Sequence, residues 1–263
     1  MSHNAATIRF TTYEHPLGER IRTLLRLEHL FRQAHFFHRE CRNGWDSRML
    51  VVSLFELLDL FSRTDLKSEI MKEIDRSIAS LQPLIENPRV DTTRLSMTLK
   101  LLKRINDNLI ETPGQLGQEL RDDPFLTSIR QRSTIPGGTC DFDLPAYHQW
   151  LEGDPALRLR LQQEWLETLT PIRQAIEGLL QMVRDSATPC AVTAINGQYQ
   201  QPLDTQHAYQ MIRIKLPCCR ETLYPEISGS RHRINIRFMQ LNQLSLPEPV
   251  NLDRQFELSL CLL

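Results

Sequence analysis

The sequence has no long run of apolar residues. Its longest candidate, residues 49–61, carries Glu56 and Asp59 and falls short of the ~18 residues that span a bilayer. Residues 1–15 also lack the apolar core of a secretory signal peptide. We therefore expect no membrane insertion and a cytoplasmic location.

Paired cysteines are missing as well. The six cysteines stand at positions 41, 140, 190, 218, 219 and 261, and none has the Cys-x-x-Cys spacing of a zinc or redox site. Adjacent residues of a strand point to opposite faces, so Cys218 and Cys219 suit neither a metal nor a shared disulfide. His35 and His38, three residues apart on a predicted helix, have only Glu40 as a nearby carboxylate. The sequence therefore predicts reduced thiols, no metal site and no cofactor.

Motifs that carry catalysis are also absent. Pro136-Gly137-Gly138 lacks the Gly-Lys-Ser/Thr ending of a phosphate-binding loop, and no Gly-x-Ser-x-Gly occurs. Neighbouring carboxylates such as Asp122-Asp123 have capping and turn roles available to them. We therefore predict no catalytic residues and no enzymatic activity.

The charges nearly cancel. Thirty-one lysines and arginines face 32 aspartates and glutamates, which leaves a formal net charge of −1. This balance argues against a dedicated nucleic-acid-binding protein, although it leaves room for a local basic patch.

Hydrophobic periodicity divides the chain into a helical middle and two β-rich ends. Apolar spacing of three and four predicts helices over 19–39, 47–62, 92–111, 124–133, 155–169 and 171–186, with a helix after Asp65 and further short helices between them. Residues 6–13 and four segments after 187 alternate instead, and Asn196-Gly197 is typical of a hairpin turn. We predict an α+β protein: an all-helical bundle domain at 17–187 and an antiparallel β-sheet domain formed by 1–16 and 188–263.

One of these alternating segments, residues 227–241, carries an unusual charge pattern. As a strand, it would direct Ile234, Ile236 and Phe238 to the core and a basic set to the opposite face. That set comprises Arg231, Arg233, Asn235, Arg237 and Met239. Arginines about 7 Å apart can bind carboxylates or phosphates, although this stretch by itself favours an ordinary strand with a solvated outer face.

A second pair of cations could extend this basic face. Arg213 and Lys215 are two residues apart on another predicted strand, so they share one face. If that face coincides with the face of Arg233 and Arg237, the sheet has a broad basic surface. On a nearly neutral protein, such a surface favours a specific acidic partner.

Several stretches, in this order, resemble the ZapD family of bacterial cell-division proteins. They are Tyr13-Glu14-His15-Pro16-Leu17, Arg22-Thr23-x-x-Arg26-Leu27-Glu28, Glu56-Leu57-Leu58-Asp59, Arg130-Gln131-Arg132, Ile135-Pro136-Gly137-Gly138, Cys140-x-Phe142-Asp143-Leu144-Pro145, Leu223-Tyr224-Pro225-x-Ile227-Ser228-Gly229 and Ile236-Arg237-Phe238-Met239. The resemblance covers almost the whole chain. It implies a non-enzymatic homodimer that binds the C-terminal tail of FtsZ and bundles FtsZ filaments at the midcell Z-ring.

The resemblance also implies which residues bind FtsZ. Carried onto this sequence, they are Arg63, Arg233, Arg237, Arg26, His148 and Arg121. Pro124 stands where the family pattern leads us to expect another basic residue near Arg121. We expect one basic pocket per subunit, where the helical domain meets the sheet, and therefore two pockets per dimer for two filaments.

A different class of function stays open at this point. The same basic sheet surface could serve a nucleic-acid-binding regulator. The near-zero net charge and the lack of aromatic residues among the arginines disfavour that alternative.

Overall fold

The computed structural model describes residues 10–262 apart from 64, 89, 218–221 and 242–245. The chain divides into two compact units, which we call the β unit (residues 1–23 and 180–263) and the helical unit (residues 24–179). Within the described ranges, no helix combines the length and the apolar character that crossing a membrane requires.

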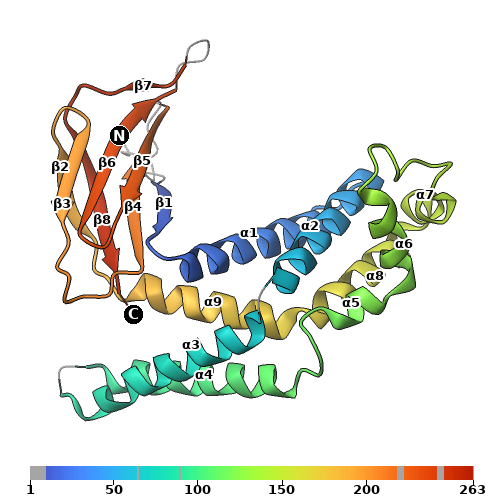
Figure 1. The fold of residues 1–263 in the computed structure, drawn as a ribbon, viewed down its shortest axis with the longest axis horizontal. Coiled ribbons are helices and arrows are strands. Elements are labelled where there is room, and N and C mark those ends of the chain that lie inside the picture. Colours follow the sequence, from blue (N-terminus) through green and yellow to red (C-terminus); the bar gives the residue numbers. More distant parts are fainter. Residues whose placement is uncertain (1–9, 64, 89, 218–221, 242–245, 263) are drawn as a thin grey trace, which may run out of the picture. The chain divides into compact units, whose positions relative to one another are not determined.

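The helical unit is built from helices whose order is shown in Figure 1. They are α1 (Glu19–Arg39), α2 (Gly44–Arg63), α3 (Leu66–Leu81), the 3-10 helix η1 (Gln82–Glu86), α4 (Thr92–Glu111), α5 (Gln118–Asp122), α6 (Pro124–Ser133), α7 (Pro145–Glu152), α8 (Pro155–Thr168) and α9 (Thr170–Asp185). Helices α1 and α9 have residues in both units.

Local sequence signals set the starts of several helices. The side chains of Asp91, Asp123 and Asp154 accept hydrogen bonds from backbone N–H groups in the first turns of α4, α6 and α8. Pro124 and Pro155 stand at the first position of α6 and α8, where proline removes no helical hydrogen bond. These caps explain why the helices predicted at 92–111 and 124–133 begin where they do in the structure.

The β unit consists of two antiparallel sheets. The first sheet has the order β1-β4-β8-β2, with β1 (Phe10–Pro16), β4 (Met211–Pro217), β8 (Arg254–Cys261) and β2 (Cys190–Ala194). The second sheet has the order β3-β6-β5, with β3 (Gln198–Pro202), β6 (Arg233–Gln240) and β5 (Leu223–Gly229), and the short β7 (Glu248–Pro249) also pairs with β6.

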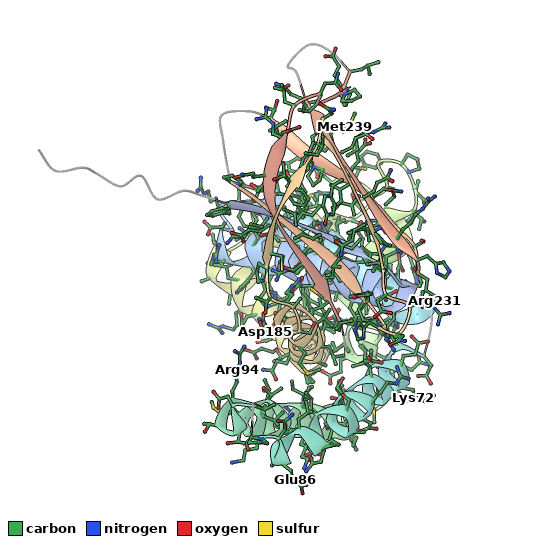
Figure 2. The ribbon with its side chains drawn as sticks, turned by 90° about the vertical axis from the view of Figure 1, so that its left-hand side faces the viewer. Lys72, Glu86, Arg94, Asp185, Arg231 and Met239 are labelled. Atoms are coloured by element: carbon green, nitrogen blue, oxygen red, sulfur yellow. The ribbon has the colours of Figure 1, made fainter. Side chains whose placement is uncertain are left out.

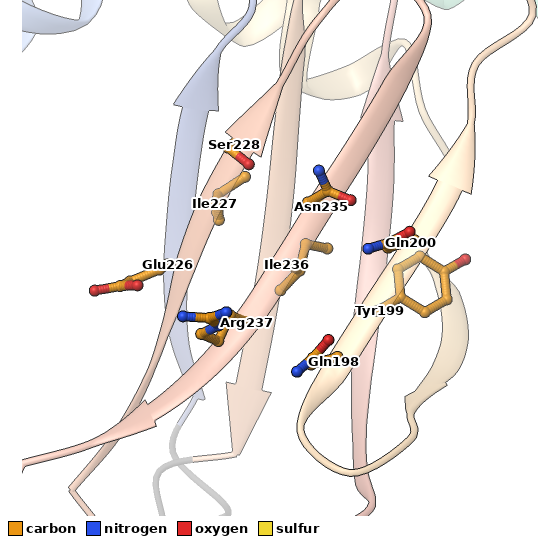
Figure 3. Close-up of a pocket in the computed structure, with 9 residues that line it drawn as sticks. All are labelled: Gln198, Tyr199, Gln200, Glu226, Ile227, Ser228, Asn235, Ile236 and Arg237. Atoms are coloured by element: carbon orange, nitrogen blue, oxygen red, sulfur yellow. The ribbon is translucent and has the colours of Figure 1, made fainter. Parts of the chain in front are cut away.

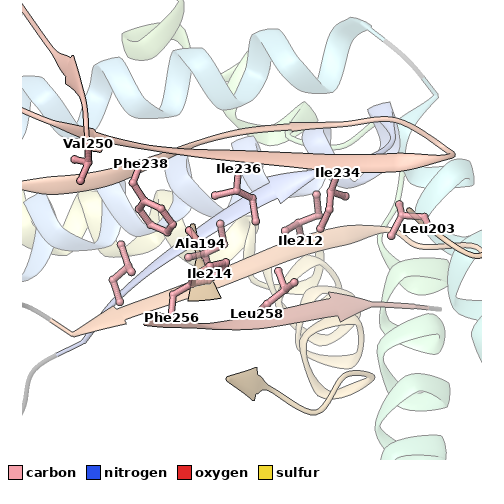
Figure 4. Close-up of a cluster of buried hydrophobic side chains, with 11 residues drawn as sticks. Ala194, Leu203, Ile212, Ile214, Ile234, Ile236, Phe238, Val250, Phe256 and Leu258 are labelled. Atoms are coloured by element: carbon pink, nitrogen blue, oxygen red, sulfur yellow. The ribbon is translucent and has the colours of Figure 1, made fainter. Parts of the chain in front are cut away.

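Apolar side chains from both sheets form a common core (Figure 4). Ile212 and Ile214 come from β4, Phe256 comes from β8, and Ile236 and Phe238 come from β6; all are buried. The rings of Phe238 and Phe256 meet edge to face, with centroids 5.2 Å apart. The two sheets therefore pack face to face through these residues, which leaves the opposite face of each sheet outward.

The predicted α+β class is confirmed, with corrections to its β part. The N-terminal strand does join the C-terminal strands, because β1 pairs with β4. It runs over residues 10–16, however, while residues 6–9 of the predicted strand lie outside the described residues. The expected single sheet is in fact two.

The Asn196-Gly197 turn has the predicted conformation but not the predicted pairing. Asn196 has a φ of 49° and Gly197 a φ of 72°, the positive values that a two-residue hairpin turn needs. Its flanking strands meet only at the bridge between Ile195 and Gln198. Strand β2 then pairs with β8 and β3 with β6, so the turn connects the two sheets.

Candidate partner-binding surface

Strand β6 presents polar side chains on the outward face of the second sheet. Ile234, Ile236 and Phe238 are buried, whereas Arg233 and Arg237 are exposed, as the alternation predicts. We call the outward set Arg233, Asn235 and Arg237 the β6 face. Because a strand rises about 3.3 Å per residue, its two arginines are anchored roughly 13 Å apart.

Two residues predicted for this face do not belong to it. Arg231 precedes the first residue of β6 and lies in the turn that joins β5 to β6. Met239 occupies the right parity but is 7% exposed, so it adds no open surface. Figure 2 labels both residues, at opposite ends of the β5–β6 hairpin.

The strand register surrounds the β6 face with polar neighbours. Gln198 of β3 and Glu226 of β5 stand on either side of Arg237, and Gln200 and Ser228 flank Asn235 in the same way. Figure 3 shows these side chains around a pocket of ≈ 460 Å³. The second sheet therefore offers an open pocket with Arg237 on its central strand, and Arg233 lies further along the same strand outside the pocket lining.

The arginines of the β6 face form no ion pair within the described part of the chain. Among the residues that the structure describes, no carboxylate forms an ion pair with Arg233 or Arg237. Between them, the Oδ1 atom of Asn235 is buried and accepts no hydrogen bond from any described group. The arginines of the face are therefore donors that remain available to a ligand.

Arg213 and Lys215, unlike Arg233 and Arg237, form ion pairs within the protein. They project from β4 in the first sheet, where Arg213 Nε lies 2.9 Å from Glu14 Oε1 and Lys215 Nζ lies 3.3 Å from Glu257 Oε2. The broad basic surface considered from sequence is therefore wrong: these cations belong to the other sheet and are already paired.

Glu14 forms a compact cluster with two arginines. Its carboxylate also accepts hydrogen bonds from Arg184, at 2.8 Å from Nε and 2.7 Å from Nη2. Burial by itself would raise the pKa of Glu14, but the hydrogen bonds and charges of Arg184 and Arg213 outweigh it and hold this pKa below its ordinary value. The cluster joins β1, β4 and α9 within the β unit.

Arg121, another predicted binding residue, contacts the backbone of its own unit. Its Nη1 donates to the carbonyl of Leu116 at 2.5 Å, and its Nη2 donates to the carbonyl of Leu58 at 3.1 Å. Burial lowers the pKa of the Arg121 guanidinium, and the nearby charge of Arg130 lowers it further. These contacts favour a role in holding α2 and α5 together.

The other three predicted residues occupy separate helices of the helical unit. His148 is exposed on α7, and its Nδ1 lies 3.1 Å from Asp141 Oδ1. Arg26 is exposed on α1. Arg63 is the last residue of α2, and its side chain lies outside the described residues. Of the six predicted residues, the structure brings Arg233 and Arg237 together on one strand face.

The histidines for which no metal site was predicted make ordinary hydrogen-bonding contacts. His35 Nδ1 is 2.9 Å from the carbonyl of Phe31, and His38 Nδ1 is 3.5 Å from Gln162 Oε1. No group of three or more His, Cys, Asp or Glu side chains suited to a metal occurs in the part of the chain that is described. Cys218 and Cys219 lie outside that part.

Sequence reasoning missed the residues that flank the β6 face. Gln198, Gln200 and Glu226 are exposed, and each is several residues or more away from β6 along the chain. Alternation could have assigned Glu226 to the outward side of its own strand. It could not have placed Glu226 beside Arg237, since register depends on which strands pair.

Comparison with known proteins now identifies the class. The profile of the ZapD family, described as "Cell division protein", matches residues 25–237. The protein named "Cell division protein ZapD" from Nitrosomonas europaea is 39% identical over 264 residues, covering 99% of this chain and 98% of its own. Those of the same name from Ralstonia pickettii and Methylococcus capsulatus are 40% and 39% identical, each covering 95% of this chain and 98% of its own. The chain belongs to the ZapD family of cell division proteins.

Proposed function

We propose that this chain is a non-enzymatic division factor that binds the C-terminal tail of FtsZ on the β6 face. The proposal rests on which arginines are exposed and which of them form internal contacts. Arg233 and Arg237 are exposed and have no ion-pair partner among the described residues, whereas Arg121 and Arg213 are held by internal acceptors. Free guanidinium groups are suited to bidentate binding of a partner's carboxylates.

The geometry suits an extended acidic segment. Two carboxylates that match the roughly 13 Å between the arginine anchors could be held at once, because an extended chain also rises ~3.3 Å per residue. Exposed ion pairs contribute only about 0.2–1 kcal/mol each, so a single tail should bind weakly and release readily.

Weak single contacts are sufficient for a filament. We propose that the chain acts as a homodimer, so that two β6 faces engage two filaments and bundle them at the midcell Z-ring in the cytoplasm. Many tails along one filament would supply avidity, which can raise the overall affinity by roughly 10²–10⁴ without any new contact.

Co-sedimentation with GTP-assembled FtsZ tests this proposal. We expect the chain to pellet with intact FtsZ filaments, to stay in the supernatant with filaments that lack the C-terminal tail, and to pellet less as salt rises. Pelleting that does not depend on the tail would refute the proposed docking mode.

Charge reversal then tests the site. Arg237→Glu should abolish tail-dependent pelleting while the far-UV circular dichroism and the oligomeric state stay unchanged. Arg160→Glu is a matched control, because Arg160 is exposed on α8, outside the β6 face. Equal losses in both variants would mean that net charge matters and the β6 face does not.

A further inference from the structure

Arg237 has an acidic neighbour that the proposed function does not use. Glu226 stands directly opposite Arg237 in the β5–β6 register, and both side chains are exposed on the same face. Residues opposed in this way have Cβ atoms about 4.5–5.5 Å apart. No ion pair joins the two in the described structure, so the Glu226 carboxylate faces any ligand that reaches Arg237 from the β5 side.

The strand neighbours on the opposite side of β6 are uncharged. There the register places Gln198 of β3 beside Arg237, and Gln200 follows beside Asn235. Both glutamines are exposed and carry amide donors. The strand neighbour of Arg237 on the β3 side therefore carries no charge that would oppose a carboxylate approaching from that side.

From this asymmetry we infer that Glu226 is a specificity-determining residue, which admits the isolated carboxylates of an acidic peptide and rejects continuous polyanions. The inference rests on the proposed function, because the peptide is the tail bound on the β6 face. Duplex nucleic acid carries one negative charge per ~1.7 Å of its axis, so it cannot cover Arg237 without also placing phosphates beside Glu226. The peptide docks on the Gln198 side, where it meets neutral donors.

Two labelled probes separate the ligand classes: a synthetic peptide of the FtsZ C-terminal tail and a short DNA duplex. Binding is measured by fluorescence anisotropy at low salt with the full chain. Glu226→Gln should raise DNA affinity by about five- to tenfold, because it removes repulsion at roughly 7 Å, and should raise peptide affinity by at most about twofold. Glu248→Gln, an exposed position on β7 of the same sheet, adds the same charge and should change either affinity less than about twofold.

A charge-conserving exchange tests the side of approach. The double variant Gln198→Glu/Glu226→Gln moves the carboxylate from β5 to β3, so the net charge does not change. We expect peptide affinity to fall by about fivefold or more, since the carboxylate now stands on the docking side. Unchanged peptide affinity in this variant would overturn the assigned side.

The outcomes also distinguish the two proposals. Equal gains for peptide and DNA in Glu226→Gln, or gains no larger than those of Glu248→Gln, would overturn the selectivity of Glu226 and leave tail binding intact. No binding of the peptide by the wild-type chain would refute the proposed function itself, and with it the selectivity that is defined by that peptide.

Discussion

Replacing Glu14 by glutamine should destabilise the β unit, because it removes the shared counter-charge of two arginines. Glu14 accepts hydrogen bonds from Arg184 and Arg213, and the three side chains are only 17%, 11% and 28% exposed. Glutamine has nearly the same volume and can still accept a hydrogen bond. The substitution therefore tests the charge and not the packing.

The expected loss is about 2–3 kcal/mol. Removing one partner of a fully buried ion pair costs ~3–5 kcal/mol, because a charge is left without compensation. The loss here should be smaller, since part of each side chain reaches solvent and water can replace some of the lost interaction.

Hydrogen exchange followed by mass spectrometry can measure this loss locally. Peptides that cover β1 and β4 report on the β unit, and a loss of 2–3 kcal/mol corresponds to roughly a 30- to 150-fold drop in protection. Trp45, Trp150 and Trp165 all lie in the helical unit, so tryptophan fluorescence during urea unfolding follows that unit separately. We expect the fluorescence midpoint to move little.

Glu257→Gln provides the matched control on the same sheet. Glu257 pairs with Lys215 at 3.3 Å, but the two side chains are 37% and 43% exposed, so this pair should contribute at most about 1 kcal/mol. If Glu14→Gln and Glu257→Gln reduce protection equally, the argument that burial makes the Glu14 cluster strong is wrong.

The effect of Glu14 should also depend on pH. Its pKa in the folded protein lies below the ordinary value of 4.5, so the folded state favours the charged carboxylate. Its contribution to stability is therefore complete above about pH 5 and is lost as the pH falls through the folded pKa. The difference in protection between wild type and Glu14→Gln should shrink on acidification; a difference that grows below pH 4.5 would contradict this sign.

Three other substitutions test separate contacts. Gly197→Ala should reduce the hydrogen-exchange protection of β3 by at least about tenfold, because the φ of Gly197 is positive and the added Cβ would collide with the carbonyl oxygen of Val250. Unchanged protection of β3 would contradict the turn geometry. Arg121→Met should destabilise the helical unit by about 2 kcal/mol in tryptophan-monitored urea unfolding, because two backbone carbonyls lose a charged donor. Tail binding should stay intact. Loss of tail binding in a folded Arg121→Met variant would mean that Arg121 contributes to the binding site. Arg237→Gln should bind the tail peptide more weakly and with a shallower salt dependence in anisotropy titrations, and an unchanged salt dependence would count against a charge contact at this position.

Patterns within single segments made much of the fold predictable. Capping by Asp91 and Asp123 has a mechanism that acts over three residues, so these helix starts could be placed without tertiary information. The alternation of Ile234, Ile236 and Phe238 likewise fixed which side of β6 is buried, because period two admits only one apolar face.

Pairing between distant segments could not be read in the same way. Alternation shows that Arg213 and Arg237 each lie on an outward face, but it does not show that their strands belong to different sheets. Nor does it show that Arg213 is neutralised by Glu14, 199 residues away, while Arg237 keeps its charge free. Telling an arginine in an internal ion pair from one that is exposed and has no ion pair in the described structure therefore required the register.

The sequence by itself determined the elements, the outward position of the arginines and the resemblance to a division family, since each depends on residues close together in the chain or on their order. Tertiary structure alone decided that two sheets form the β unit and that Glu226 and Gln198 stand on opposite sides of Arg237. The physical reason is that cross-strand neighbours are set by the packing of a shared core, a condition that involves both sheets at once.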